Sequence, residues 1–225
     1  MVTPTKNTSL LKFPAAPRLP SPTREYSPDM VDQLENSLRL YFNQIDNTLQ
    51  ALLGVRGSQY MNAPYASITK TTDQTAAAID TAYRIAFTQS DYLNGATFSA
   101  SDGVTVAQSG LYNIQFSAQF KNTDSADHPV GVWLRTGNAT TAIHDVPNTA
   151  SYIYVPSKHG SLFGVNILAA NFFVELSAND YVELWWSTND LAVSLWTVPS
   201  QTSPFVAPAS PAAVMTVSFV SSVIG

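Results

Sequence analysis

The chain contains no cysteine, which excludes disulfides, thiolate metal sites and thiol nucleophiles together. Charged residues are scarce as well: they make up 12% of the chain, about half the share that is usual in soluble domains. So low a charge density is typical of a protein that packs against copies of itself or against a larger assembly. A free surface that is polar but uncharged is the alternative.

Long hydrophobic runs are missing too. No apolar stretch approaches the ~18 residues of a membrane-spanning helix, so no membrane span is expected. The N-terminal "MVTPTKNTSLLKFPAAP" is interrupted by prolines and does not resemble a signal peptide. If the protein acts outside a cell, we expect it to arrive by another route, such as release on lysis. No basic patch with interleaved aromatics is present, so nucleic-acid binding is not expected.

The usual motifs of catalysis and cofactor binding are also absent. His128, His144 and His159 do not follow a metal-ligand spacing such as HxxxH, and the His144–Asp145 pair has no GxSxG motif beside it. A loop or surface position is therefore the favoured interpretation of each histidine. The 94–103 stretch "NGATFSASDG" is expected to be a loop and does not form a nucleotide site.

Three carboxylates, Glu175, Asp180 and Glu183, lie within nine residues, and paired carboxylates can hydrolyse glycosides. The two glutamates, however, fall on separate predicted strands, and Asp180 has the character of a turn residue. The sequence therefore predicts no catalytic residue, no metal site and no cofactor.

Residues 1–27 are predicted to form an extended, proline-rich arm. Prolines at positions 4, 14, 17, 20 and 22 each fix φ and favour extended geometry in the preceding residue. The arm is either an unattached tail or a segment that docks into a groove of a partner. In the docking interpretation its anchors are Leu10, Leu11, Phe13 and Leu19.

A helix is predicted over residues 28–54, followed by a linker over 55–64. Ser27 suits the N-cap, Pro28 the first helical position, Asp29 the positive end of the helix dipole and Gly54 the C-terminal end. A 3-4 spacing of the heptad type predicts a coiled-coil seam at Val31, Leu34, Leu38, Tyr41, Ile45, Thr48 and Leu52. A helix that lies on the domain of its own chain is the alternative.

Residues 65–225 are predicted to be almost entirely β-strand. Runs rich in β-branched and aromatic residues recur between turn residues. They cover residues 66–70, 82–87, 109–120, 130–136, 151–156, 160–168, 171–177, 181–187, 192–198 and 212–222. About ten strands without a helix between them indicate a mainly β protein with an antiparallel two-sheet sandwich or jelly roll.

Tryptophans are the remaining candidates for ligand binding. Adjacent Trp185 and Trp186 must point to opposite faces of a sheet, so one of them is expected in the core. The other, together with Trp196, could stack on a sugar ring, although burial at a subunit interface is the commoner outcome.

Residues 65–225 are called the head below. Three segments of the head resemble the trimeric jelly rolls of the complement globular head and tumour-necrosis-factor group. They are "SGLYNIQFSAQF", "LSANDYVELWW" and "PAAVMTVSFVSS". Gly110, Tyr112, Ile114 and Phe116 match a glycine–x–tyrosine–x–phenylalanine-like strand, with isoleucine where phenylalanine is common. Asn179, Asp180, Val182 and Leu184 match a "GDxVxL"-like strand start, with asparagine in place of glycine, and Phe219 matches an aromatic of the last strand. The resemblance implies a homotrimer, in which three helices would bury their seams against one another.

The layout of arm, helix and jelly-roll head is similar to small structural proteins of tailed bacteriophages. That resemblance implies a non-enzymatic virion protein, assembled in the host cytoplasm and extracellular after lysis. The arm would contact other virion proteins, and the head would project and bind a host glycan or protein. A capsid decoration protein and a carbohydrate-binding module are the alternatives.

Overall fold

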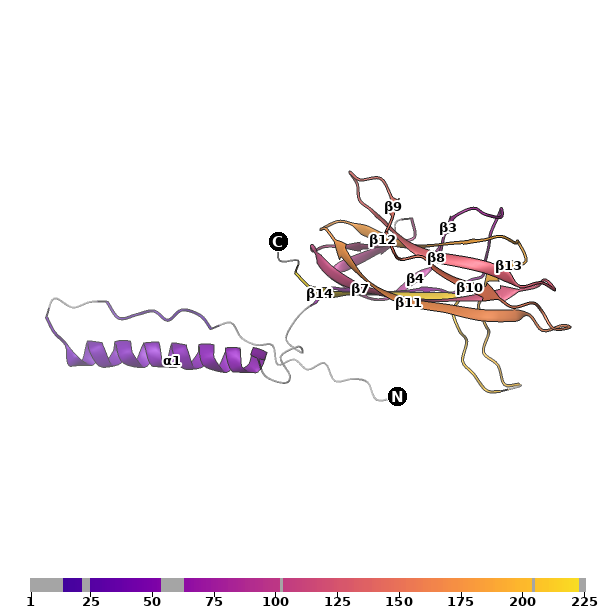
Figure 1. Cartoon of the computed structure of the whole chain (residues 1–225). Helices are drawn as coiled ribbons and strands as arrows, with labels where there is room; N and C mark the ends of the chain where they lie inside the picture. Colours follow the sequence, from indigo (N-terminus) through magenta and orange to yellow (C-terminus); the bar gives the residue numbers. More distant parts are fainter. Residues whose placement is uncertain (1–13, 22–24, 54–62, 102, 204, 223–225) are drawn as a thin grey trace. The chain divides into compact units, whose positions relative to one another are not determined.

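The computed structural model describes residues 14–21, 25–53, 63–101, 103–203 and 205–222 (Figure 1). The chain divides into two units, residues 1–62 and 63–225, and each is described by itself. In the first unit, Pro14, Pro17 and Pro20 are half-buried while the residues between them are exposed, which is the three-residue period of polyproline II. Leu19 of the predicted docking anchors is 51% exposed. The other three anchors, Leu10, Leu11 and Phe13, lie outside the described residues.

The predicted helix is present as α1 (Pro28–Leu53). The Ser27 hydroxyl accepts a hydrogen bond from the Met30 N–H at 3.4 Å, and the Ser27 carbonyl accepts the Val31 N–H at 3.2 Å. Ser27 therefore caps the helix as its sequence position predicts. Asp29 lies in the first turn, where a negative charge complements the helix dipole. None of the described helices is both long enough and apolar enough to cross a membrane.

The predicted seam follows one face of α1. Leu34, Leu38, Tyr41, Ile45 and Thr48 are half-buried in the single chain, whereas Val31 and Leu52 are exposed. The Thr48 hydroxyl donates to the Gln44 carbonyl at 2.8 Å, so this polar group is satisfied within the helix. The coiled coil itself stays a prediction.

The second unit is a sandwich of two seven-stranded antiparallel sheets (Figure 1). Sheet A has the order β2 (Gln74–Thr75), β13 (Val193–Leu195), β7 (Gly110–Asn122), β14 (Ala213–Ser221), β1 (Tyr65–Lys70) and β4 (Gln89–Asn94), with β11 (Gly164–Leu176) paired to β7. Sheet B has the order β10 (Ser151–Val155), β8 (His128–Gly137), β12 (Tyr181–Thr188), β6 (Gly103–Val106) and β5 (Ala96–Ser99), with β3 (Tyr83–Arg84) on β12 and β9 (His144–Asp145) on β8. The chain passes repeatedly between the sheets, as in a jelly roll. The mainly β, antiparallel prediction is confirmed.

The core lies between the two sheets. From β7 it receives the alternating set that the sequence predicts on one face: Tyr112, Ile114, Phe116, Ala118 and Phe120. From sheet B it receives Leu134, Leu184 and Trp186, and the rings of Phe120 and Trp186 have centroids 5.6 Å apart. The Tyr112 hydroxyl donates to the Gln108 carbonyl at 2.7 Å, which satisfies a polar group that would be costly to bury alone. Each fully buried large apolar side chain contributes about 1.5–3 kcal/mol to folding.

Several predicted strand boundaries are wrong, since the described residues form fourteen strands where about ten were expected. Residues 164–168 and 171–176 of two separate predicted runs belong to the single strand β11, because Ala169, Ala170 and Asn171 continue its ladder along β7. The 82–87 run is a strand only at β3. The 94–103 stretch is not a loop, because β4 ends in it, β5 lies within it and β6 begins at its end.

Candidate functional site

The outer face of sheet B carries an aromatic and cationic surface, the Trp–Arg platform, formed by Trp133 and Arg135 of β8 and Trp185 of β12. The strand register places Trp133 directly opposite Trp185 and Arg135 opposite Glu183. Directly opposite residues on one face of an antiparallel pair are close enough for their side chains to interact. The sheet therefore assembles the platform from residues about fifty positions apart in the sequence.

The guanidinium of Arg135 lies close to both rings of the platform. Its guanidinium carbon lies 4.1 Å from the centroid of the Trp185 ring and 5.8 Å from that of Trp133. Both distances are within the ~6 Å range of cation–π attraction. The rings are half-buried, so part of each remains open to solvent.

Two carboxylates fix the polar edges of the platform. Asp145 of β9 accepts hydrogen bonds from Arg135 Nε at 2.5 Å and from Trp133 Nε1 at 2.7 Å. The hydrogen bond from Arg135 is the main cause that holds the pKa of Asp145 below its usual range. Glu183, which is nearly buried, accepts from Trp185 Nε1 at 2.7 Å and pairs with Arg84 at 3.0 Å. Every indole N–H and cation of this surface therefore has a partner, which orients the rings.

The three tryptophans proposed from the sequence do not share one surface. Trp186 is fully buried, so Trp185 is the member of the pair whose ring can reach a ligand. Trp196 follows β13 of sheet A, and its ring meets Phe163 edge-on with centroids 6.3 Å apart. Lys121 Nζ lies 5.9 Å from the Trp196 centroid and 2.8 Å from Asp73 Oδ2. Trp196 therefore belongs to a second aromatic–cation cluster.

The outer face of sheet A has a different character. Its middle rows carry small and uncharged side chains, which line a groove of about 590 Å³: Gln115, Ser117, Ala169, Asn171, Val214 and Thr216. Apolar side chains flank the groove on β11, where Ile167 is 53% and Phe173 62% exposed. The charges of β7 and β11 on this face are Lys121 and Glu175, near the strand ends. The middle of this outer face therefore presents uncharged side chains, with charges of β7 and β11 only near the strand ends.

The three candidate carboxylates do not form an acid–base pair. Glu175 is exposed on sheet A, whereas Glu183 is paired with Arg84 on sheet B. Asp180 accepts the Ser177 N–H at 2.8 Å and an N–H of Asn138 at 2.7 Å, as a turn residue would. Two carboxylates that act together in glycoside hydrolysis must face one substrate bond, and these two glutamates face opposite sides of the sandwich.

Sequence reasoning did not select Trp133 or Arg135 as ligand-binding residues, and it considered Asp145 only as the partner of His144 in an incomplete triad. A signal for two of them was available, because Trp133 and Arg135 are two apart on a predicted strand and so share a face. Asp145 belongs to the two-residue strand β9, and the residues His144 and Asp145 do not predict a strand.

No family model matches the chain, and no curated protein matches it. A solved structure, the Eiger TNF from S. frugiperda, is similar over 73% of this chain and 97% of its own, with 10% sequence identity and a TM-score of 0.49. The resemblance to phage proteins stays a prediction.

Proposed function

We propose that the chain is a non-enzymatic structural protein that assembles as a homotrimer and attaches by its N-terminal part to a larger particle. The particle we propose is the virion of a tailed phage, whose small appendage proteins have a similar layout. The observation that carries the self-association is the outer face of sheet A, whose middle rows are uncharged and which exposes apolar side chains on β11. The apolar stripe of α1 supports it independently.

The outer face of sheet A is unlike an ordinary solvated face. A free antiparallel sheet usually alternates apolar side chains inward with polar ones outward. Here Val165, Ile167 and Phe173 of β11 point outward and are 40%, 53% and 62% exposed. Burying such area on another copy of the head stabilises the assembly by about 25 cal/mol per Å². Small residues in the middle rows, such as Ser117 and Ala169, allow two backbones to approach closely.

The Trp–Arg platform supports a second element of the proposal, recognition of a host glycan by the projecting head. Aromatic rings offer stacking surface to a sugar, and the charged groups around them offer hydrogen bonds. Decoration of a capsid is the competing role, and it requires no ligand on sheet B.

Light scattering on the full chain tests the homotrimer. The expected mass is about three times 24.3 kDa. A monomer at micromolar concentration would contradict the self-association of both the seam and the sheet face.

Binding of labelled protein to host cells tests the recognition role. We expect Trp185→Ala to abolish binding while the mass and the circular dichroism spectrum stay unchanged. Tyr154→Ala is the matched control, because Tyr154 is also an exposed aromatic of sheet B and lies on another strand. Equal binding by wild type and Trp185→Ala, or no binding by the wild type, would favour the decoration role.

A further inference from the structure

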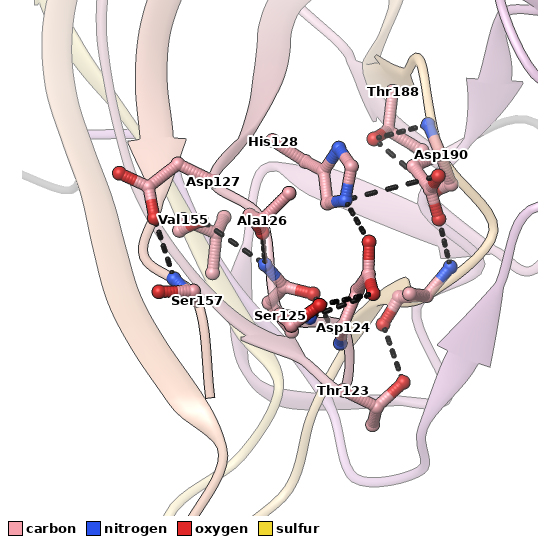
Figure 2. Close-up of polar contacts among 12 residues, drawn as sticks. Thr123, Asp124, Ser125, Ala126, Asp127, His128, Val155, Ser157, Thr188 and Asp190 are labelled. Carbon is pink, nitrogen blue, oxygen red and sulfur yellow. Dashed lines mark hydrogen bonds and ion pairs between the residues drawn. The ribbon is translucent and has the colours of Figure 1, made fainter. Parts of the chain in front are cut away.

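Three side chains from two loops converge outside the surfaces described above. Asp124 lies in the loop between β7 and β8, His128 begins β8, and Asp190 lies in the loop between β12 and β13. Figure 2 shows one ring nitrogen of His128 in contact with both carboxylates. Its Nε2 is 2.9 Å from Asp124 Oδ2 and 3.7 Å from Asp190 Oδ2. One oxygen of each carboxylate thus faces the same ring nitrogen.

We propose that His128 Nε2, Asp124 Oδ2 and Asp190 Oδ2 bind one divalent transition-metal ion, of which Zn²⁺ is the representative, and that the ion joins the two loops. The three ligand atoms lie within 4.8 Å of one another. In a tetrahedral site with bonds of about 2.0–2.1 Å, neighbouring ligand atoms are about 3.3 Å apart. The observed separations from Nε2, 2.9 and 3.7 Å, lie on either side of that value. Small side-chain shifts therefore suffice to admit the ion.

The ligand types select the class of ion. Imidazole nitrogen with carboxylate oxygen suits Zn²⁺ and neighbouring transition metals, whereas Ca²⁺ and Mg²⁺ prefer oxygen ligands alone. Two carboxylates and a neutral imidazole also carry the charge that a divalent cation neutralises. A neutral His128 has at most one proton at Nε2, so it can donate to only one of the two carboxylates at a time. A metal ion at the centre would satisfy both.

The surrounding loops hold the ligands in place. Asp124 Oδ1 accepts the Ser125 N–H at 2.6 Å, and Asp190 Oδ1 accepts the Ala192 N–H at 2.7 Å, which leaves each Oδ2 directed at His128. Outer hydrogen bonds of this kind orient metal-binding carboxylates.

Buried hydrogen bonds hold the loop that carries Asp124, and the site itself is open to solvent. Asn122, fully buried at the end of β7, donates its amide hydrogens to carbonyls that include those of Ala126 and Pro156, at 2.7 and 3.1 Å (Figure 2 shows this loop). The side chains of Asp124 and Asp190 are 41% and 38% exposed, whereas that of His128 is 12% exposed. An ion can therefore enter from solvent and keep water as its fourth ligand, as in open zinc sites.

Isothermal titration of the full-length, metal-free protein with Zn²⁺ tests the proposal. We expect one Zn²⁺ per chain. His128→Gln should lower the Zn²⁺ affinity by more than the roughly 10–100-fold that is lost when a hydrogen-bond partner of a metal ligand is removed. Asp190→Asn should lose affinity as well while it keeps the shape of the loop, and it carries the test if His128→Gln does not fold. His144→Gln is the matched control, because His144 is an exposed histidine on β9, and it should bind Zn²⁺ like the wild type.

Co²⁺ provides a second readout, because tetrahedral and octahedral Co²⁺ differ strongly in their visible absorption. We expect an intense tetrahedral spectrum in the wild type that is lost in Asp190→Asn. The alternative to a metal ion is a protonated His128, whose imidazolium would form ion pairs with both carboxylates. No Zn²⁺ binding by the wild type, or equal binding by wild type, His128→Gln and Asp190→Asn, would overturn the metal site in favour of that alternative.

Discussion

Neighbouring tryptophans with opposite environments should respond very differently to the same truncation. Trp186 is fully buried and packs against Tyr83 and Phe120, with ring centroids 6.4 and 5.6 Å away. We expect Trp186→Ala to lower the free energy of unfolding by about 3–5 kcal/mol, because it removes buried area and leaves a cavity. Trp133→Ala, a half-buried control on the outer face, should cost less, and urea denaturation measures both. Equal losses would show that Trp186 is not in the core.

Acid should destabilise the protein through carboxylates whose folded-state pKa is depressed. Burial raises the pKa of Asp73, but hydrogen bonds from Lys121 and Thr197 outweigh it and leave the pKa lowered. A group of this kind stabilises the fold above its unfolded pKa, about 3.9. That contribution is lost as the pH falls through the lower, folded-state pKa. We expect the thermal midpoint to drop as the pH falls below about 4, and the midpoint of Asp73→Asn to drop less. An unchanged slope in Asp73→Asn would contradict this role.

Single residues also show what the sequence could and could not predict. Alternation predicts that Trp185 and Trp186 point in opposite directions, but it does not say which one points inward. The direction is decided by contacts with Tyr83 and Phe120, which come from other strands. Likewise, Asp124 and His128 are four residues apart, yet Asp190 reaches them only through the pairing of β8 with β12.

At the scale of elements, β11 depends on a close backbone approach at its first residue. A Cβ added to Gly164 would lie 1.6 Å from the carbonyl oxygen of Pro156, so the backbone would have to move. We expect Gly164→Ala to cost about 2–3 kcal/mol of unfolding free energy, within the range of overpacking. Gly160→Ala is the control: nothing lies within 4 Å of its added Cβ, and only its φ of +62° is unfavourable. It should cost about 1–2 kcal/mol; a larger loss there than at Gly164 would contradict the expectation.

Long strands were predictable and short ones were not, for a physical reason. Strand β7 carries five inward apolar residues in strict alternation, so its own composition specifies it. Strand β4, "QSDYLN", has almost entirely exposed and largely polar residues and exists because β1 supplies hydrogen-bond partners along it. The paired strand, not the local sequence, stabilises such a segment.

At the scale of the whole molecule, two separate surfaces are proposed to hold the trimer. Ile45→Asp would place a charge in the seam of each copy, and Ile167→Asp would place one on the outer face of sheet A. Buried unpaired charges are costly, so we expect each change to weaken the trimer and both together to give monomers in light scattering. Asn43→Asp, on the exposed side of α1, adds the same charge as a control and should leave the mass unchanged. A double variant that stays trimeric would refute both surfaces.

The class of the head, a mainly β sandwich, followed from composition and from the recurrence of strands. Its strand order did not, because the pairing of β1 with β14 joins the two ends of the head. Local sequence patterns carry no information about partners so distant. The resemblance in three short segments supplied the jelly-roll expectation instead.

The central position of β14 in sheet A has a consequence for synthesis on the ribosome. Strand β14 lies between β7 and β1, and Lys70 pairs with Ala213, roughly 140 residues later. At about 5–20 residues per second, β1 would wait about 7–30 seconds for this neighbour. During that time sheet A would be incomplete, and the inward apolar faces of β1 and β7 would remain exposed. A nascent head is thus exposed to chaperones, and to other nascent copies on the same message, until its last strand has been made.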